Sequence, residues 1–447
     1  MSLSAVVLAA GLGTRMRSPL AKVLHPVLGR PMVGWIVEAL QAVGADVVVV
    51  VHHQEDQVRA ALAPLGVRFA HQEAPRGTGD AVASALSLLP NAGPVVVTAG
   101  DTPLLCARSI QRLLATHVGS CTVAAFCAAD PTGYGRMVPG VGVVEEAACT
   151  VEQRTIRVVN SGLYVFDAAY LRQRLPHLQP HAPKGELWLT DLVGPDAAVV
   201  ADFAEEEFLG VNDRAQLAQA RGILRRRVNR AWASSGVDFA DLDTISVDVG
   251  VQLEPGAVLG LGAVLTGACR VAGEVGPHCV VHDTVIEPGA RVLAGSVCDG
   301  ASVGAGAVVG PLARLRPGAD IRAGAHVGNF VEVKKAVLHE GAKANHLAYI
   351  GDAEVGAGAN VGAGTITCNY DGVSKHKTTI GAGAFIGSNS ALVAPIRIGD
   401  GAIVGAGSTL TQDVPADAIA VERAPVKLTE ATAERLRAHY RKRAGRS

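Results

Sequence analysis

Two cationic side chains follow a glycine turn close to the start of the sequence. Arg15 comes two residues after Gly13, and Lys22 comes seven residues after Arg15. Backbone N–H groups of a glycine turn can hold phosphate, and nearby cations can neutralise a polyphosphate. The turn lacks the third glycine of the dinucleotide fingerprint and the Gly-Lys-Ser/Thr of a P-loop, so both of those classes are excluded. The spacing indicates another kind of phosphate site, with a purely structural turn as the alternative.

His346 is the second candidate for chemistry, in a segment that also holds Lys343 and Tyr349. A neutral imidazole, with an ordinary pKa of about 6.5, can accept a proton from an attacking amine at neutral pH. A lone histidine is more often an inert surface residue, so the prediction of a general base depends on the repeat described below. Cys368 has no paired base and is interpreted as a structural thiol.

The elements that must position Arg15 and Lys22 follow an alternating pattern up to about residue 212. Apolar runs at 5–10, 47–51 and 95–99 predict buried strands, and helical periodicity covers 33–43 and 58–65. This alternation is typical of a doubly wound parallel sheet. We therefore expect a Rossmann-like α/β domain over residues 1–212.

One helix is predicted between Asn212 and Trp232, because Leu217, Ala220 and Leu224 fall on one face. The opposite face carries four arginines, at positions 225, 226, 227 and 230. We interpret them as a solvated helix face without a nucleic-acid role. The helix is expected to belong to a linker over residues 213–244.

A repeat of six residues begins near Leu253. Aliphatic residues recur at every sixth position in two unbroken series, Val303, Val309, Leu315, Ile321, Val327, Val333 and Ile380, Ile386, Leu392, Ile398, Val404, Leu410. With small residues at the turns, this pattern predicts a parallel β-helix of about nine coils over residues 245–424. The β-helix accounts for the 52 glycines and for an aromatic content of only 4%.

The repeat is interrupted twice. Val333 to Val355 spans 22 residues, more than a coil of about 18, and Val361 to Ile380 spans 19. Loops that project from a rigid scaffold commonly carry function, so we expect His346 in the first interruption to be catalytic. Residues 425–447 are polar and basic and are predicted to form a frayed helix or tail.

Composition excludes several classes of protein. The 40 Lys and Arg balance 41 Asp and Glu, which leaves no basic field for nucleic acid. The eight cysteines form no CxxC pair, so neither a zinc site nor a disulfide framework is indicated. No apolar run approaches the length of a membrane span, which is about 18 residues, and no targeting segment is recognised. We expect a cytoplasmic protein without a membrane span.

The first half resembles the sugar-nucleotide pyrophosphorylases. Leu8, Ala10-Gly11 and Gly13-Thr14-Arg15-Met16 match their opening motif, although Ala21 stands where they have Pro before the lysine. Further matches follow in order, which are Gln72 with Gly77-Thr78-Gly79, Gly100-Asp101, residues 131–136, Glu152, Asn160 and residues 210–212. Ala99 departs from the family, which often has an aromatic residue before Gly-Asp.

The resemblance implies a nucleotide site with one Mg²⁺ between Asp101 and Asn212, and Arg15 and Lys22 as catalytic cations. Gln72 and Gly77-Thr78 would contact uracil, and Gly135, Glu152 and Asn160 would contact the sugar. The full set implied to bind UTP or the sugar nucleotide is Leu8, Ala9, Ala10, Gly11, Lys22, Gln72, Gly77, Thr78, Gly135, Glu152, Asn160 and Asn212.

The second half resembles the left-handed β-helix acyltransferases. Across nearly its whole length the chain is similar to a family of bifunctional enzymes, with N-acetylglucosamine-1-phosphate uridyltransferase and glucosamine-1-phosphate acetyltransferase activities. The matching strings in this half are residues 314–318, 326–332, 362–365 and 368–372. Asn345 and Ala348 depart from a related enzyme, which has Gly and Thr, without removing a reacting group.

By this resemblance His346 is the base, Arg316 and Lys334 hold the sugar phosphate, and Tyr349 and Asn360 hold the sugar. The residues implied to line a groove for the co-substrate acetyl-CoA are Ala363, Asn369, Tyr370, Ser388, Ala406 and Arg423. The family forms homotrimers. The implied product is UDP-N-acetylglucosamine, a precursor of peptidoglycan and lipopolysaccharide.

Two alternatives remain at this stage. The chain could be a single-activity pyrophosphorylase whose β-helix is purely structural, or a binding protein with two inactive sites. The presence of His346, Asp101 and Lys22 favours the bifunctional hypothesis.

Overall fold

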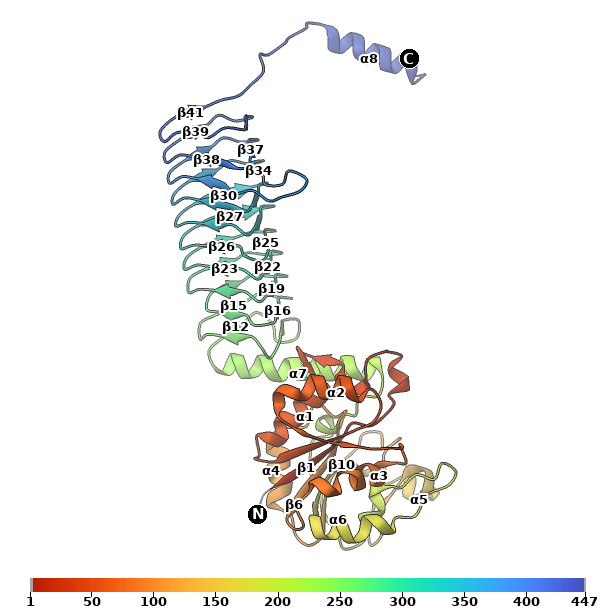
Figure 1. The fold of residues 1–447 in the computed structure, drawn as a ribbon. Helices are drawn as coiled ribbons and strands as arrows, with labels where there is room; N and C mark the ends of the chain where they lie inside the picture. The colour runs from red at the N-terminus through yellow and green to blue at the C-terminus, as the bar shows by residue number, and fades with distance from the viewer. Residues whose placement is uncertain (1–2, 446–447) are drawn as a thin grey trace. The chain divides into compact units, whose positions relative to one another are not determined.

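The computed structural model describes residues 3–445, and its internal contacts divide the chain into two compact units (Figure 1). The first unit comprises the residues up to Ser234 together with Leu242–Gly250. The second comprises Ser235–Asp241 and the residues from Val251 onward. Among the described residues, no helix combines the length and the apolar content needed to cross a bilayer.

The first unit is built on a nine-stranded mixed sheet with the main order β11-β7-β10-β6-β1-β4-β5. Strands β6, β1, β4 and β5 are parallel, whereas β10 is antiparallel to both of its neighbours. The strands are β1 (Ser4–Leu8), β4 (Asp46–Val51), β5 (Arg68–His71), β6 (Pro94–Ala99), β7 (Cys121–Cys127), β8 (Arg136–Val138), β9 (Gly142–Val144), β10 (Val158–Asp167) and β11 (Ala198–Val200). The predicted strands exist, but the sheet is mixed where the apolar pattern predicted parallel pairing throughout.

Helices cover both faces of this sheet because its central strands are apolar on both sides. Val47, Val49 and Val51 of β4 pack in one cluster with α1 (Met32–Gln41), α2 (Glu55–Leu62) and α4 (Ala107–Ala115). Val48 and Val50 pack in a second cluster with α3 (Thr78–Ala85) and α6 (Ala168–Arg174). Successive side chains of a strand point to opposite faces, so one valine run serves both cores. The doubly wound prediction is confirmed.

Helix α7 (Arg214–Ser234) packs on the first unit. Leu217, Ala220 and Leu224 are buried in a cluster that also contains Met16 and Leu104. The arginine face is only partly solvated, because the Arg227 guanidinium donates to the Leu104 carbonyl at 2.7 Å and Arg226 forms an ion pair with Asp243. The contacts therefore group this helix with the first unit, whereas the sequence pattern assigned it to a linker.

The second unit is a parallel β-helix, with three strands per coil in three separate sheets. Its nine-stranded sheet runs from β14 (Gln252–Leu253) to β38 (Ile396–Ile398), in agreement with about nine predicted coils. All six residues of the first aliphatic series are buried in the interior, and so is the second series up to Val404. Burial of one aliphatic side chain per flat side stabilises each coil on its neighbour. The left-handed β-helix class predicted for this half is confirmed.

The strands of the second unit are short and follow one another regularly. They are β12 (Asp238–Phe239), β15 (Val258–Leu259), β16 (Val264–Thr266), β17 (Arg270–Val271), β18 (Glu274–Val275), β19 (Val280–His282), β20 (Val285–Ile286), β21 (Arg291–Val292), β22 (Val297–Asp299), β23 (Ser302–Val303), β24 (Val308–Val309), β25 (Arg314–Leu315), β26 (Asp320–Ile321), β27 (His326–Asn329), β28 (Glu332–Lys334), β29 (Val337–Leu338), β30 (Lys343–His346), β31 (Tyr349–Gly351), β32 (Ala353–Val355), β33 (Asn360–Val361), β34 (Ile366–Cys368), β35 (Thr378–Ile380), β36 (Phe385–Ile386), β37 (Ala391–Val393), β39 (Ile403–Val404), β40 (Thr409–Leu410) and β41 (Ile419–Ala420).

The first predicted interruption of the repeat is wrong. Residues 333–355 form regular consecutive sides of the β-helix, in which Leu338, Ala344 and Ile350 point inward and are buried. The inward residue of one side is Ala344, which is not one of the large aliphatic residues used to count the repeat. That side was therefore missed in the count, and the coil was counted as too long. The second interruption is confirmed, because residues 369–377 form a loop between β34 and β35 that carries a Tyr370–Lys375 bridge (Figure 1).

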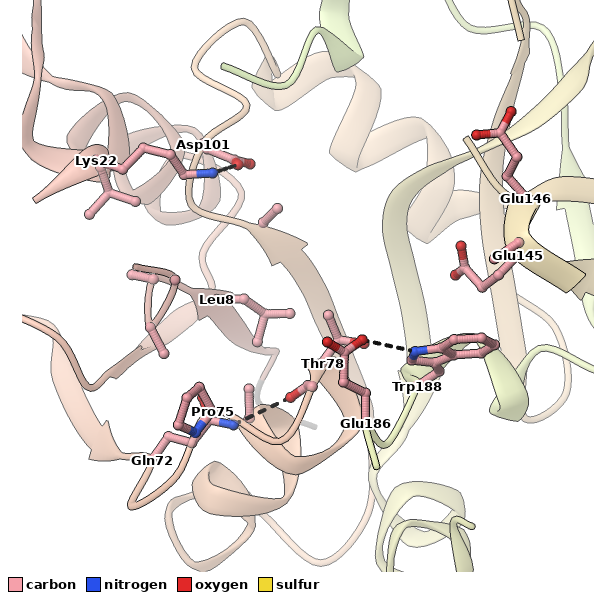
Figure 2. A pocket seen from close by; sticks show the side chains of 18 residues that line it. Leu8, Lys22, Gln72, Pro75, Thr78, Asp101, Glu145, Glu146, Glu186 and Trp188 are labelled. Atoms are coloured by element: carbon pink, nitrogen blue, oxygen red, sulfur yellow. Dashed lines mark hydrogen bonds and ion pairs between the residues drawn. The ribbon is translucent and has the colours of Figure 1, made fainter. Parts of the chain in front are cut away.

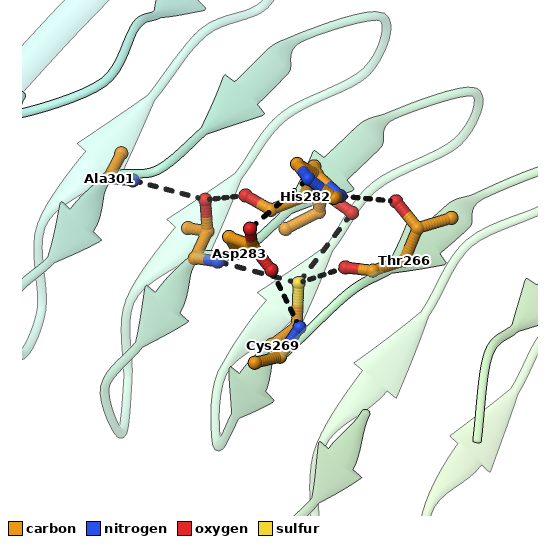
Figure 3. Close-up of polar contacts among 8 residues, drawn as sticks. Thr266, Cys269, His282, Asp283 and Ala301 are labelled. Carbon is orange, nitrogen blue, oxygen red and sulfur yellow. Dashed lines mark hydrogen bonds and ion pairs between the residues drawn. The ribbon is translucent and has the colours of Figure 1, made fainter. Parts of the chain in front are cut away.

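A polar cluster on one corner of the β-helix shows that its histidines and cysteines can be structural (Figure 3). The His282 ring contacts the Thr266 hydroxyl at 2.9 Å and the Asp283 carboxylate at 3.2 Å. The Cys269 thiol donates to the Thr266 carbonyl at 3.1 Å, and burial raises its pKa. These contacts join successive coils, and the raised pKa keeps the thiol unreactive.

The C-terminal segment ends in α8 (Thr432–Arg443), a basic helix whose residues are all exposed. A helix or tail was predicted here. Nothing in its exposed, basic character indicates a catalytic role.

Candidate active sites

A cavity of about 640 Å³ opens beside the carboxyl ends of β1 and β6 in the first unit (Figure 2). Nine of the predicted nucleotide-site residues line it, which are Leu8, Ala9, Ala10, Gly11, Lys22, Gln72, Gly77, Thr78 and Asp101. The carboxyl ends of parallel strands are where open α/β sheets bind their ligands. The glycine turn leads into a single 3₁₀ turn, Thr14–Met16, so no helix N-terminus stands behind it.

Lys22, Asp101 and Asn212 meet at one side of this cavity. The Lys22 ammonium pairs with the Asp101 carboxylate and donates to the Asn212 Oδ1 atom at 3.2 Å. Arg15 donates to the same oxygen at 3.0 Å. Both oxygens therefore converge on one ammonium group, although they come from distant parts of the sequence.

The backbone holds these side chains together. The Val211 N–H donates to the Asp101 carbonyl at 2.9 Å, which fixes the start of the Asn212 segment beside the end of β6. Gly13 has a φ of +60°, and a Cβ there would lie 2.5 Å from the Lys22 Cβ. Glycine at this position thus lets the Lys22 stem pass over the turn.

The donor set suits a hard divalent cation. Carboxylate and amide oxygens are ligands that Mg²⁺ accepts while it keeps several waters. The cavity is lined by four carboxylates, Asp101, Glu145, Glu146 and Glu186, but by one ammonium, Lys22. A polyphosphate would be repelled by this lining without an added cation. Among the residues that the structure describes, no group of three or more His, Cys, Asp or Glu is placed to hold a metal.

Gln72 is buried in the wall of the cavity. Its amide donates to the Asp80 carboxylate at 2.8 Å, and Asp80 is held in turn by Arg76 at 2.8 Å. Gln72 also donates to the Gly77 carbonyl at 3.3 Å. With the amide N–H groups used inside the protein, the side-chain oxygen is the atom left to accept a hydrogen bond from a ligand.

The structure places Glu152, a predicted sugar-site residue, outside the cavity. Glu152 is exposed in α5 (Val151–Arg154) and does not line the cavity, whereas Glu145 does. Glu145 lies beside Gly135, a predicted sugar-site residue, because a Cβ added to Gly135 would lie 3.5 Å from the Glu145 Oε2 atom. Both glutamates precede Asn160 in a weakly patterned loop, and of the two only Glu145 lines the cavity.

Gly135 and Asn160 lie beside this wall without lining the cavity themselves. The Asn160 N–H donates to the Gly135 carbonyl at 2.9 Å, and its side-chain amide donates to the Tyr164 hydroxyl at 2.6 Å. Figure 2 shows Glu145 and Glu146 across the cavity from Lys22 and Asp101.

Two lining residues that the sequence analysis missed come from the loop before Leu189. Glu186 accepts from the Trp188 indole at 3.3 Å, and the Trp188 ring stacks on His181 at 3.7 Å. Leu187 between them pairs with the backbone of Arg76 and Gly79, which brings the loop against the start of α3. No local motif marks this loop, and only an isolated tryptophan in a polar stretch could have drawn notice.

On the β-helix, the predicted sugar-phosphate residues lie on one sheet. Lys334 in β28 is in register with Gly351 in β31. The Arg316 N–H donates to the carbonyl of Val333, the residue before Lys334, at 2.9 Å. Arg316 pairs with Glu332 at 2.8 Å, and this hydrogen bond is the main cause of its raised pKa. The Tyr349 hydroxyl accepts from Asn369 at 3.5 Å.

His346 belongs to a column of residues along one corner of the β-helix. Each member stands two residues after an inward residue, and the inward residues are paired in register between coils. We call this set the corner column, and it consists of Asn329, His346, Ala363, Ser388 and Ala406. The side chains beyond His346 are small, which leaves room for an elongated ligand. Arg423 joins its far end by donating to the Ala406 carbonyl at 2.9 Å.

The remaining predicted residues are distributed unevenly. Tyr370 is exposed on the loop of residues 369–377, with the Lys375 ammonium 4.1 Å from its ring centroid. Asn369 is buried and donates to Asp352 at 2.5 Å, so it lies with Tyr349 rather than on the corner column. Asn360 is in register with Lys343 in the eleven-stranded sheet, whereas Tyr349 belongs to β31 in the ten-stranded sheet. The structure therefore does not bring Asn360 to the other sugar-site residues within one chain.

The fold and the two sites define a nucleotidyltransferase joined to a hexapeptide-repeat transferase. Family models agree, with a MobA-like NTP transferase domain over residues 5–173 and a bacterial transferase hexapeptide of six repeats over residues 377–412. The chain is 49% identical to the bifunctional protein GlmU of Thermus thermophilus, covering 96% of this chain and 98% of the relative. It is 45% identical to the protein of that name from Sorangium cellulosum (98% of each) and 40% to that from Acinetobacter baumannii (95% and 96%).

The chain belongs to the GlmU family. It is an enzyme of the transferase class, as the sequence predicted. Because the relatives match both units over nearly the whole chain, the comparisons give no support to a pyrophosphorylase with a purely structural β-helix.

Proposed function

We propose that the chain catalyses two reactions of UDP-N-acetylglucosamine synthesis. The second unit transfers the acetyl group of acetyl-CoA to glucosamine 1-phosphate, and the first unit transfers the uridylyl group of UTP to N-acetylglucosamine 1-phosphate with release of pyrophosphate. The convergence of Lys22, Asp101 and Asn212 in the cavity of the first unit carries the assignment of uridylyl transfer. The assignment of acetyl transfer depends on His346 on the β-helix, in a chain that belongs to the GlmU family.

In uridylyl transfer, a phosphate oxygen of the sugar phosphate attacks the α-phosphorus of UTP, and the bond to pyrophosphate breaks. Asp101 and Asn212 would hold Mg²⁺, which supplies charge neutralisation at the reacting phosphates. Lys22 contacts the Asp101 carboxylate and the Asn212 amide oxygen, and Arg15 contacts the Asn212 oxygen, so both cations lie where they can exchange to the phosphates of the nucleotide. Positioning and charge stabilisation account for most of the rate of such reactions.

The walls of the cavity support the choice of substrates. The Gln72 oxygen can accept the N3–H of uracil, and cytosine lacks that hydrogen. Glu145, beside Gly135 and Asn160, can accept hydrogen bonds from sugar hydroxyl groups, and we propose it in place of Glu152. The Trp188 ring offers an apolar face to the same end of the cavity.

In acetyl transfer, the amine nitrogen of glucosamine 1-phosphate attacks the thioester carbonyl. A C–N bond forms, the C–S bond breaks, and His346 accepts the proton that the nitrogen loses and passes it to the departing thiolate. Arg316 and Lys334 would bind the sugar phosphate, with Tyr349 and Asn360 at the sugar. The groove for acetyl-CoA would follow Ala363, Ser388 and Ala406 to Arg423, with Tyr370 on the neighbouring loop.

We propose that the protein is a cytoplasmic homotrimer. Asn360 lies away from the other sugar-site residues of its own chain, so in a trimer it would complete the sugar site of a neighbouring copy. We also retain 1–212 and 245–424 as the catalytic domains, with 213–244 as the linker and 425–447 as a tail.

The test is a pair of assays on the full-length protein. Thiol release from acetyl-CoA should require glucosamine 1-phosphate, and pyrophosphate release from UTP should require N-acetylglucosamine 1-phosphate and Mg²⁺. Pyrophosphate release without any thiol release by folded protein would contradict the bifunctional proposal and leave a pyrophosphorylase alone.

A further inference from the structure

Asn329 and His346 occupy neighbouring places in the corner column. Asn329 ends β27 and His346 ends β30, and the two residues are paired in register. The Asn329 Oδ1 atom lies 2.9 Å from the His346 Nδ1 atom. This is a normal hydrogen-bond distance, and no motif in the sequence connects the two residues.

The backbone around this contact leaves little freedom. The Leu347 N–H donates to the Asn329 carbonyl at 3.1 Å, which joins the two coils next to the side-chain contact. A Cβ on Gly328 would lie 1.8 Å from the Asn345 carbonyl oxygen, so the strands approach too closely for any larger residue. The packing of the coils therefore fixes the backbone of Asn329 beside that of His346, within reach of the Nδ1 atom of the ring.

The Asn329 amide oxygen determines which nitrogen of the His346 ring carries the hydrogen. A carbonyl oxygen only accepts hydrogen bonds, so the imidazole nitrogen that faces it must carry a hydrogen. In a neutral imidazole the other nitrogen, Nε2, then has the free electron pair. A base that acts through Nε2 needs this tautomer, and the partner of Nδ1 selects it.

We propose that Asn329 is a positioning residue for acetyl transfer, which holds His346 in the tautomer whose Nε2 atom accepts the proton of the attacking amine. The proposal rests on the proposed function of His346. An amide in this role orients the ring without placing a negative charge beside it, whereas a carboxylate would favour the protonated imidazolium.

The other titratable groups on the elements packed against His346 are few. They are His326 at the start of β27, Lys343 at the start of β30 and Tyr349 in β31, while β33 and the turn at Leu347–Ala348 carry none. A change in pH dependence caused by replacing Asn329 can therefore be assigned to the imidazole contact by comparison with these residues.

The experiment compares Asn329→Leu and Asn329→Asp with the parent protein, measuring thiol release from acetyl-CoA over a pH range centred around the ordinary imidazole value of about 6.5. Asn329→Leu should lower kcat by about 10- to 100-fold, the usual loss when the orienting partner of a histidine is removed, with KM values little changed. Asn329→Asp keeps an acceptor, so it should retain activity at high pH, and the acidic limb of its profile should move to higher pH by about one unit. A purely structural role for Asn329 would not move this limb.

Two controls keep folding and function apart. Each variant should retain uridylyl transfer, which depends on the first unit, and ¹⁵N NMR of the parent should show the His346 hydrogen on Nδ1. Unchanged kcat and pH profile in Asn329→Leu, with activity lost in His346→Ala, would overturn the positioning role and leave the proposed acetyl transfer standing. Absence of thiol release by the parent would instead refute the proposed function itself.

Discussion

The two candidate sites differ in how the chain brings their residues together. Lys22 and Asp101 are 79 residues apart, and Lys22 and Asn212 are 190 apart, yet all three meet in the cavity of the first unit. On the β-helix, Asn329 and His346 are 17 residues apart, and Tyr349 and Asn369 are 20 apart, which is close to one coil. In a solenoid each coil contacts only its neighbours, so spacing in sequence translates directly into position.

This difference also changes what a substitution should do. A surface site on a repetitive scaffold can lose one functional side chain without disturbing the coils below it. A site formed where distant segments converge depends on contacts that are also structural.

His346→Ala should abolish most acetyl transfer, by about 10²- to 10⁴-fold in kcat, because loss of a general base removes that factor. His346 is exposed, so the melting temperature should stay within a few degrees of the parent. Thiol release and calorimetry measure the two quantities. Uridylyl transfer serves as the control, and retained acetyl transfer would remove His346 from the mechanism.

Asp101→Ala should lower uridylyl transfer by about 10²- to 10³-fold, because it removes a proposed ligand of the Mg²⁺ that would stabilise charge at the phosphates. It also leaves Lys22 without its ion-pair partner, so a modest fall in the stability of the first unit is expected. Asp101→Asn keeps the shape and separates the two effects. Pyrophosphate release at several Mg²⁺ concentrations measures the loss, and activity independent of Asp101 would refute the proposed metal site.

Glu145→Gln and Glu152→Gln form a matched pair that tests which of the two glutamates contacts the sugar. Glu145→Gln should raise KM for N-acetylglucosamine 1-phosphate by about tenfold, equivalent to one lost hydrogen bond to a charged group. Glu152→Gln should have no effect, because Glu152 is exposed outside the cavity. The opposite ranking of the two variants would restore the original motif match.

The loop of residues 369–377 offers a pH test with the smallest effect. Hydrogen bonds from the Ser374 N–H, His376 and the Val373 N–H lower the pKa of Asp371. A lowered pKa means that the stabilisation of the loop is present above the ordinary value of 3.8 and is lost as the pH falls through the lower folded value.

The measurement is an NMR titration of the Val373 and Ser374 amides, which should keep their shifts until the pH is well below 3.8. Asp371→Asn should make both amides exchange faster at neutral pH and raise KM for acetyl-CoA by a few-fold. A titration midpoint at the ordinary value would contradict the hydrogen-bonded loop.

Elements with a local residue pattern could be predicted from the sequence alone. The valine run at 47–51 predicted a strand apolar on both faces, and the six-residue series of aliphatic residues predicted the β-helix and its number of coils, because inward positions recur with the geometry of the coil. The matches at Lys22, Asp101 and Gln72 predicted residues that line one cavity. The catalytic role of His346 stays a prediction, and the extra-long coil that was one reason for it is absent, because the coil that carries His346 is regular.

Other features have no local residue pattern and became visible only in the folded chain. Ala344 occupies an inward position that a larger aliphatic residue would have marked, and its burial became visible only when the coils were stacked. Glu145 and Glu152 are equivalent as residue types, and the direction of the loop decides which one reaches the cavity. Trp188 enters the wall because the neighbouring Leu187 pairs with the backbone of Arg76 and Gly79, a segment far earlier in the chain. Contacts of this kind depend on how distant segments pack, and that information is absent from the local order of residues.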